Sequence, residues 1–273
     1  MRKTIQHSVK ISGVGLHTGV PSTMTFQPDN HGICFVRLDL PGSEPIPADL
    51  YHVGSTLRGT NLVQGKAEVW TVEHVLSALH ALGITDVRVE MDGPEPPVMD
   101  GSSLVYMQQL EQAGLTELQE EQPLLTLKYP VTYSCGKIAY TAEPAEELTI
   151  TFVYEHKHPL VGRQEYTFTF NTENYKAQIA PARTFGFEEE LAFLKAHGLA
   201  KGGSLENAVV VGKDKFLNEL RFDNELVRHK ILDLVGDFCL IGKRLSPMKI
   251  VCHMGGHKHN VLFGRLLLAN SGE

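Results

Sequence analysis

The chain has 273 residues, with 25 Lys and Arg against 32 Asp and Glu, a formal net charge of −7, and 42% hydrophobic residues. This composition is typical of a globular protein with a buried core and excludes a disordered or collagen-like chain. The acidic balance argues against a dedicated nucleic-acid binder, so we expect no nucleic-acid partner.

The first part of the chain is predicted to pass from strands to helices. Clusters of Gly, Pro, Asn and Asp separate short segments before residue 61, which indicates strands. The segment TVEHVLSALHALG has apolar residues at helical spacing and ends in Gly83, a common residue after a helix. In chain order we expect strands at 22–26 and 33–38, a helix from Thr71, a strand at 86–91 and a helix at 103–112.

The second part repeats this order after a polar, acidic segment at 116–123, which is predicted to be a linker. Alternating β-branched and aromatic residues indicate strands between 124 and 170. Beyond them we expect a helix at 188–197, a Gly-rich loop, an apolar run at 208–211, a long helix at 223–240, a strand at 248–252, and a loop followed by a short helix. The sequence therefore predicts an α+β fold of two domains, 1–120 and 121–273, each a sheet layered on helices.

The chain shows no signature of a secreted or membrane protein. No stretch reaches the ~18 apolar residues of a membrane span, and no apolar segment follows the positively charged start. The four cysteines have no C-x-x-C spacing, which predicts neither a disulfide framework nor a thiolate zinc site. We therefore expect a cytoplasmic protein that acts as a monomer.

The long helix carries the strongest signal for a site. His229, Asp233 and Asp237 fall one helical turn apart and form a single stripe, while apolar residues gather on the opposite face. The helix is therefore expected to pack by one side and to present the stripe from the other. For an isolated His and Asp, the polar face of an ordinary amphipathic helix is the better explanation, but a third carboxylate in register weakens it.

The helix that begins at Thr71 offers the complementary residues. Glu73 and His74 lie in its first turn, where the helix dipole alone favours an acidic residue. A catalytic zinc needs three protein ligands and one open position, and His74, His229 and Asp233 supply two imidazoles and one carboxylate. Glu73 is then placed to take a proton from water. Such a set also accepts Fe²⁺, which leaves the metal in the cell open.

The remaining histidines and glycines give weaker signals. In VCHMGGHKHN, His253 and His259 are expected to be exposed or locally hydrogen-bonded, and the role of His257 is open because the glycines argue against one helix through His253 and His257. GVGLHTG is followed by a strand rather than a helix, which excludes a dinucleotide fingerprint and predicts a turn, with His17 undecided. His52 and His80 are interpreted as structural, and no Walker or G-x-S-x-G motif occurs.

Several motifs, in this order, resemble one known family. They are GVGLHTG, TVEH at 71–74, PVMDGSS at 97–103, ARTFGF at 182–187, GGS at 202–204, VRHKILDLVGD at 227–237 and GGHKHN at 255–260. The chain resembles the UDP-3-O-acyl-N-acetylglucosamine deacetylase family over essentially its whole length. The resemblance implies a zinc-dependent amidase that releases acetate from this UDP-sugar in the committed step of lipid A biosynthesis, with two α+β domains facing one another around the metal.

The resemblance also implies a role for each matched residue. His74, His229 and Asp233 correspond to the zinc ligands, Glu73 to the general base, His257 to the general acid, and Asp237 to the residue that orients it. Thr184 would hold the oxyanion, Phe185 would lie against the sugar, and Lys230, Gly203 and Ser204 would contact substrate. The region from His158 to about Val211 would line a passage for the acyl chain.

One position departs from the family pattern. Met254 stands three residues before His257, where many members carry a basic residue, and Arg58 and Lys249 are candidates to supply the missing positive charge. Two alternatives stay open: a zinc amidase acting on another N-acylated amino sugar, and a catalytically silent protein that binds a sugar nucleotide or lipid.

Overall fold

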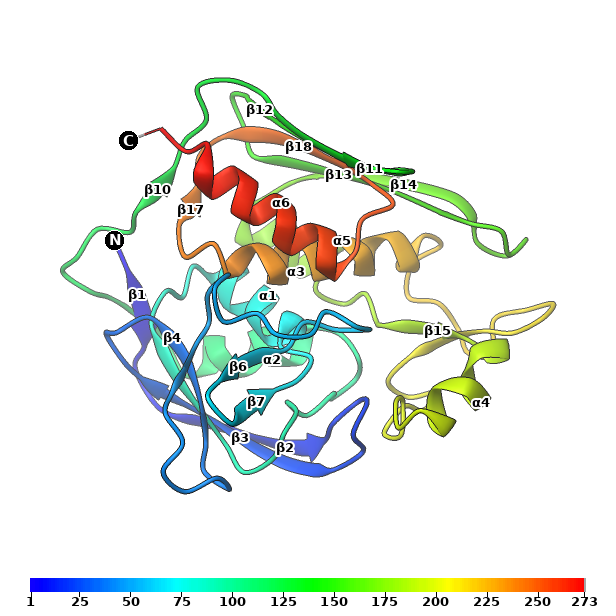
Figure 1. The fold of residues 1–273 in the computed structure, drawn as a ribbon, viewed down its shortest axis with the longest axis horizontal. Coiled ribbons are helices and arrows are strands. Elements are labelled where there is room, and N and C mark those ends of the chain that lie inside the picture. Colours follow the sequence, from blue (N-terminus) through cyan, green and yellow to red (C-terminus); the bar gives the residue numbers. More distant parts are fainter. Residues whose placement is uncertain (273) are drawn as a thin grey trace.

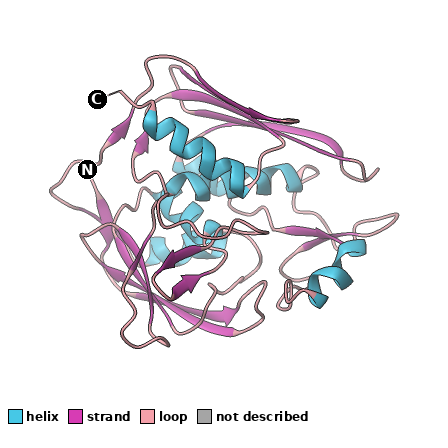
Figure 2. Ribbon diagram, in the orientation of Figure 1, coloured by secondary structure: helices cyan, strands magenta, loops and turns pink. Residues whose placement is uncertain are grey.

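The computed structural model describes residues 1–272 and has three layers (Figure 1). Two five-stranded sheets form the outer layers, and most helices lie between them. Figure 2 shows the same arrangement by element type, with one helix set apart at the side of the molecule. The α+β class with two layered parts is confirmed, whereas the domain boundary near residue 120 stays a prediction.

The N-terminal sheet has the strand order β2-β3-β8-β4-β5. Its strands are β2 (Val9–Val14), β3 (Pro21–Pro28), β8 (Val87–Met91), β4 (Ile33–Arg37) and β5 (Ile46–Pro47). Only β4 and β8 run parallel, with Phe35 opposite Val89. Alternate residues of β3, among them Met24 and Phe26, are buried, as the alternating sequence predicts for a strand with one face toward the core.

The C-terminal sheet has the same topology. Its order is β11-β12-β18-β13-β14, formed by β11 (Val131–Cys135), β12 (Ile138–Pro144), β18 (Met248–His253), β13 (Thr149–His156) and β14 (Gly162–Thr169). In both sheets the last strand in sequence lies in the centre and runs parallel to the third, here with Phe152 opposite Cys252. The repeated order of elements seen in the sequence thus corresponds to a repeated sheet topology.

The middle layer contains α1 (Glu73–Leu82), α2 (Leu104–Gln112), α3 (Thr172–Gln178), α5 (Glu225–Cys239) and α6 (His257–Ala269). Every residue of α5 except Arg228 and Lys230 is buried, so the expectation of one packed and one presented side was wrong. The reason is that α1 covers the polar stripe of α5. Gly236 permits this contact, because a Cβ at this position would lie 2.1 Å from the carbonyl oxygen of Glu73.

Four two-stranded sheets join distant parts of the chain or project from it. They pair β1 (Lys3–Ile5) with β9 (Leu115–Glu117), β6 (Leu62–Gln64) with β7 (Ala67–Val69), β10 (Leu124–Leu125) with β17 (Arg244–Leu245), and β15 (Phe185–Phe187) with β16 (Val209–Val211). Between β15 and β16 lies α4 (Glu188–Ala196), the helix at the side of the molecule in Figure 1.

These elements correct two sequence predictions and add one helix. The predicted linker at 116–123 begins inside β9, because β1 offers it a partner from the other end of the first part. The helix α3 was not predicted, and the C-terminal helix α6 has 13 residues rather than being short. Within residues 1–272, no helix combines the length and the apolar character that a bilayer crossing requires.

Candidate metal and catalytic site

The crossing of α1 and α5 brings together residues from both parts of the chain. Glu73 and His74 are the first residues of α1, and His229 and Asp233 lie one turn apart on α5. The rings of His74 and His229 meet edge to face with centroids 5.0 Å apart. All four side chains are buried, which is unusual for polar groups and requires that they satisfy one another or a bound ligand.

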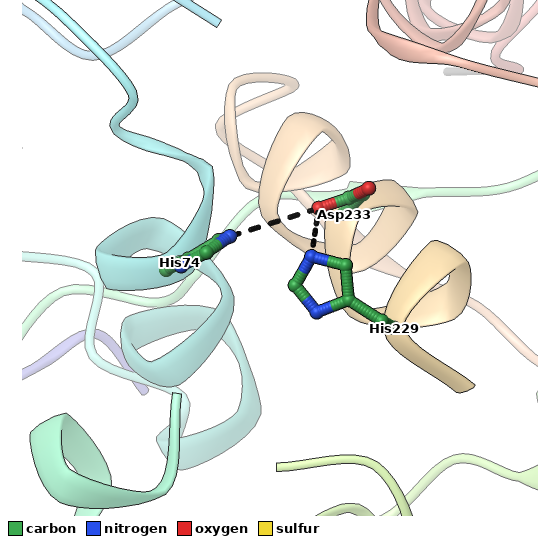
Figure 3. A group of neighbouring side chains, drawn as sticks. All are labelled: His74, His229 and Asp233. Atoms are coloured by element: carbon green, nitrogen blue, oxygen red, sulfur yellow. Dashed lines mark ion pairs between the residues drawn. The ribbon is translucent and has the colours of Figure 1, made fainter. Parts of the chain in front are cut away.

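Two imidazoles and one carboxylate converge on a single point (Figure 3). Asp233 Oδ1 lies 3.3 Å from His229 Nε2 and 3.9 Å from His74 Nε2. The three potential ligand atoms lie within 4.8 Å of one another. The sequence prediction that these three residues come together is thus confirmed by the geometry, although they are far apart in the chain.

The protonation of these groups fits a divalent cation. Burial lowers the pKa of His229 and lowers that of His74 to about 3, so both rings are neutral near pH 7. His229 Nδ1 lies 3.0 Å from the carbonyl oxygen of Ala182, to which a neutral ring donates its proton, leaving the Nε2 lone pair free. Asp233 Oδ1 is buried without a hydrogen-bond donor. Lone pairs that face one another in this way suit a cation such as Zn²⁺ with one open position.

The other oxygen of Asp233 is held by Lys230. The Lys230 ammonium donates to Asp233 Oδ2 at 2.6 Å. Burial would raise the pKa of Asp233, but the positive charge of Lys230 outweighs it and keeps this pKa below its ordinary value. Asp233 is therefore ionised near pH 7.

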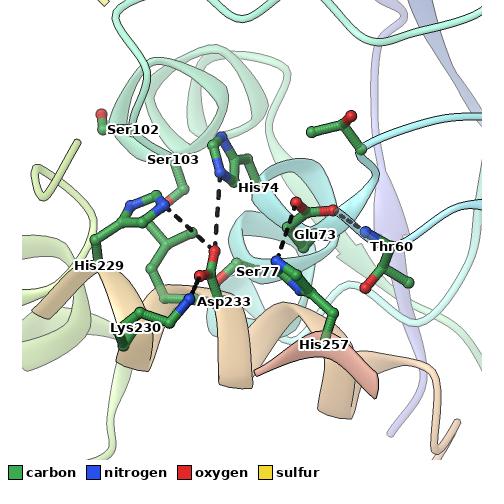
Figure 4. Close-up of polar contacts among 12 residues, drawn as sticks. Thr60, Glu73, His74, Ser77, Ser102, Ser103, His229, Lys230, Asp233 and His257 are labelled. Atoms are coloured by element: carbon green, nitrogen blue, oxygen red, sulfur yellow. Dashed lines mark hydrogen bonds and ion pairs between the residues drawn. The ribbon is translucent and has the colours of Figure 1, made fainter. Parts of the chain in front are cut away.

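A carboxylate and an imidazole stand beside this triad (Figure 4). Glu73 Oε1 lies 3.7 Å from His257 Nε2, and His257 Nδ1 lies 3.0 Å from Asp237 Oδ2. Burial raises the pKa of Glu73 to about 7, although the nearby charge of His257 opposes the rise. Burial lowers the pKa of His257, but Asp237 and Glu73 outweigh it and raise this pKa to about 9. Near pH 8 the pair is thus poised to accept one proton and to donate another.

The triad and the pair line one side of a cavity of about 690 Å³. Of the residues predicted from the sequence, all but Asp237 line it, which include Thr184, Phe185, Gly203, Ser204 and Lys230. Its far side is apolar and is built by the β15–α4–β16 unit and the following loops, with Phe187, Leu191, Leu194, Leu205, Val210 and Leu217. These residues lie in or just beyond the segment that was expected to line an acyl-chain passage.

Arg58 and Lys249, the two candidates for the missing positive charge, differ in their position relative to the cavity. Arg58 lines the cavity, where it lies 3.2 Å from Glu190 Oε2. Lys249 projects from β18 and pairs with Glu143 on β12, and it is not among the lining residues. The Met254 sulfur accepts a hydrogen bond from the Glu155 backbone N–H, so this side chain is turned toward β13.

Four further histidines, including the undecided His17, have hydrogen-bond partners in the structure. His253 Nδ1 contacts the carbonyl oxygen of Lys137 and His259 Nδ1 contacts the Tyr133 hydroxyl, so both are locally hydrogen-bonded as expected. His52 bonds to Asp49. His17 is buried, with Nε2 3.0 Å from the carbonyl oxygen of Arg58, and lines the cavity.

Some residues that support the site were missed in the sequence. Glu95 is buried and accepts hydrogen bonds from the backbone of His17 and Thr18 and from the Thr71 hydroxyl, which fixes the GVGLHTG turn against the start of α1. Asn260 donates to Asp237 Oδ2 at 2.8 Å. Asn260 belongs to a motif already noted, but Glu95 lies in a Pro-rich turn where only its charge could have indicated a role.

Two imidazoles and a carboxylate beside a buried acid–base pair are typical of hydrolases that use a metal. The sequence profile of the family described as UDP-3-O-acyl N-acetylglycosamine deacetylase matches residues 2–269. The chain therefore belongs to this family.

Curated relatives carry the same description over nearly the full length. The chain is 39% identical over 273 residues to the UDP-3-O-acyl-N-acetylglucosamine deacetylase of Helicobacter hepaticus, covering 98% of this chain and 90% of the relative. It is 40% identical over 271 residues to the protein of that name from Wolinella succinogenes, with 98% and 90% covered. With the protein of that name from Chlamydia caviae it shares 41% identity over 272 residues, with 98% and 96% covered.

Proposed function

We propose that this chain is a zinc-dependent amidase that hydrolyses the N-acetyl group of UDP-3-O-acyl-N-acetylglucosamine and releases acetate, the committed step of lipid A biosynthesis. The family assignment supports the substrate, and the relative of that name from Helicobacter hepaticus aligns over 90% of its length. The observation that carries the chemistry is the buried Asp233 Oδ1, which has no donor and faces two neutral imidazoles. His74, His229 and Asp233 would hold the metal.

The polar residues around the triad meet the demands of amide hydrolysis. The chemistry that Zn²⁺ would supply is the activation of a water molecule and of the amide carbonyl. Glu73 takes the proton that the attacking water loses, since its pKa of about 7 lets the carboxylate be ionised at working pH. The attack places negative charge on the carbonyl oxygen, toward which the Thr184 hydroxyl donates from the cavity wall.

Cleavage of the C–N bond needs a proton on the departing amine, and His257 delivers it from Nε2. Asp237 fixes this role because its Oδ2 accepts a hydrogen bond from His257 Nδ1–H, which orients the ring and stabilises its charged form. Lys230 neutralises Asp233 and contacts the polar part of the substrate, while Phe185 packs against the sugar beside Gly203 and Ser204. The apolar wall formed by the β15–α4–β16 unit accommodates the 3-O-acyl chain.

Metal analysis coupled to an acetate-release assay tests this function. The wild-type protein should contain about one zinc per chain and release acetate from the UDP-sugar, whereas His229→Ala should lose both. His253→Ala is the matched control, because this histidine is bonded to Lys137 outside the cavity. Full zinc content and full turnover in His229→Ala would show that the metal assignment is wrong.

A substrate without the 3-O-acyl chain tests the substrate assignment. The apolar cavity wall should make this analogue a poorer substrate, chiefly through a higher KM. Equal kcat/KM for both compounds would instead indicate an amidase for another N-acylated amino sugar. Tight binding without acetate release would indicate a silent binding protein.

A further inference from the structure

Thr60 bonds to Glu73, the proposed proton acceptor, and to Asp237, the residue that orients His257. It is fully buried in the loop before β6. Its backbone N–H donates to Glu73 Oε2 at 2.9 Å, a contact visible in Figure 4. Its hydroxyl donates to Asp237 Oδ1 at 2.5 Å. Its carbonyl oxygen accepts from the backbone N–H of Val72 at 3.0 Å, so all three polar groups of Thr60 are bonded to α1 or α5 or to the residue before α1.

The Thr60 hydroxyl completes the hydrogen bonding of Asp237. Asp237 Oδ2 already receives the Asn260 amide and the His257 Nδ1 proton. Within residues 1–272, the bond to Asp237 Oδ1 comes from Thr60. Since Asp237 is fully buried, removal of this hydroxyl would leave a charged oxygen without a donor, which is a costly state that the side chain would relieve by rotating. Such a rotation would carry His257 with it.

The same loop is pressed against Glu73. A Cβ at Gly59 would lie 3.2 Å from Glu73 Oε1, which shows how closely the backbone before Thr60 approaches this carboxylate. Glu73 belongs to α1 and Asp237 to α5, and Thr60 is separated from Asp237 by 177 positions in the sequence. One side chain and its own peptide group therefore set the position of two carboxylates that come from different helices.

We infer that Thr60 is a positioning residue that holds Glu73 and the Asp237–His257 pair at a fixed separation. This role rests on the proposed function, in which Glu73 accepts a proton and His257 donates one. Within the described residues, Thr60 forms no hydrogen bond to His74, His229 or Asp233 and does not line the cavity, so its effect passes through the two carboxylates. Loss of its hydroxyl should misplace the acid without weakening substrate binding, because proton transfer depends steeply on geometry.

The test compares Thr60→Val, which keeps the shape and the N–H but removes the hydroxyl, with Thr60→Ser, which keeps the donor. Thr60→Val should lower kcat about 10- to 100-fold with KM and zinc content unchanged, and Thr60→Ser should recover most of the activity. Thr4→Val is the matched control: Thr4 is buried and its hydroxyl accepts the Asp29 N–H, far from the cavity. Equal losses in Thr60→Val and Thr60→Ser, or a Thr60→Val enzyme with wild-type kcat, would overturn the inference.

A second measurement keeps the inference separate from the proposed function. The proton on His257 Nδ1, bonded to Asp237, should give a low-field ¹H resonance that is assigned by its absence in His257→Gln. This resonance should shift or broaden in Thr60→Val and stay in place in Thr60→Ser and Thr4→Val. An unchanged resonance in Thr60→Val would refute the positioning role even if the wild-type protein released no acetate, a result that would by itself refute the proposed function.

Discussion

His257 is held between two carboxylates from different helices. Its Nδ1 lies 3.0 Å from Asp237 Oδ2 on α5, and its Nε2 lies 3.7 Å from Glu73 Oε1 at the start of α1. Burial opposes the charged form of both His257 and Glu73. The negative charges of Asp237 and Glu73 nevertheless favour the charged form of His257. For Glu73, the negative charges of Asp233 and Asp237 add to the effect of burial and favour the neutral form, although the charge of His257 opposes this.

This arrangement predicts a bell-shaped pH profile. Glu73 acts only when ionised, so kcat/KM should rise with pH through its pKa of about 7. His257 acts only when protonated, so kcat/KM should fall with pH above its pKa of about 9. The two values belong to the coupled pair, so both limbs should move when either group is removed. A profile with one ionisation in the wild type, or an unchanged alkaline limb in His257→Gln, would contradict the assignment.

The close contact of α1 and α5 makes Gly236 irreplaceable. In Gly236→Ala the new methyl group would lie 2.1 Å from the Glu73 carbonyl oxygen, so the helices must separate. We expect the free energy of unfolding to fall by about 3 kcal/mol, together with a loss of turnover because Glu73 moves. Urea unfolding and the acetate assay measure the two effects.

Gly264→Ala is the matched control for this substitution. Gly264 is also a buried helical glycine, but the nearest atoms to a new Cβ there lie 3.5 Å away on Ile241 and Leu50, an ordinary contact. This variant should keep its activity and its stability within about 1 kcal/mol, with the gain in helix propensity acting in its favour. Similar losses of activity and stability in Gly236→Ala and Gly264→Ala would mean that the close helix contact at Gly236 is not their cause.

Arg58 and Lys249 give opposite predictions for substrate affinity. Arg58 faces the cavity, so Arg58→Gln should raise KM for the anionic UDP-sugar several-fold, up to about tenfold, and should make KM less sensitive to salt. Lys249→Gln should leave KM unchanged, since this side chain pairs with Glu143 on the sheet. Steady-state kinetics at two ionic strengths measure both KM values. A raised KM in Lys249→Gln with an unchanged KM in Arg58→Gln would show that Lys249, and not Arg58, binds the nucleotide.

His80 should make the protein less stable in mild acid. Burial against Phe170 lowers its pKa from 6.5 to about 4, so the unfolded chain binds more protons than the folded one between these pH values. The free energy of unfolding should therefore fall as the pH drops through this window, by up to about 3 kcal/mol from this residue. His80→Leu should make the free energy of unfolding less dependent on pH, which urea unfolding at pH values above and below this window would measure. His31→Leu is the control, because that side chain is exposed, and a wild-type slope in His80→Leu would disprove the attribution.

Periodicity predicted the parts of the fold that local sequence determines. The stripe on α5 and the acidic residue and histidine at the start of α1 were visible because helical spacing places them on defined faces. The candidate metal triad was predicted from donor chemistry, since few sets of residue types could bind a catalytic metal. The bounds of α5 and α4 also agree with the predicted helices to within two residues.

Long-range contacts account for what the sequence did not predict. The strand β9 exists because β1 pairs with it, and its own residues resemble a polar linker. His257 could not be assigned from its glycine-flanked position, because its partner Asp237 lies on another helix. Thr60 belongs to no sequence motif or periodic pattern that would indicate a role. Its contacts arise only because the folded chain brings its loop against α1 and α5.

The burial of α5 has a consequence for how this protein can vary. Thirteen of its 15 residues are buried, among them His229 and Asp233 of the candidate metal triad and Asp237, which bonds to His257. The two partly exposed residues also have partners, since Lys230 bonds to Asp233 and Arg228 stacks on Tyr166. Almost no residue of this helix can be substituted without loss of a contact. Substitutions that confer resistance to an inhibitor of the cavity should therefore arise in the β15–α4–β16 wall rather than in α5.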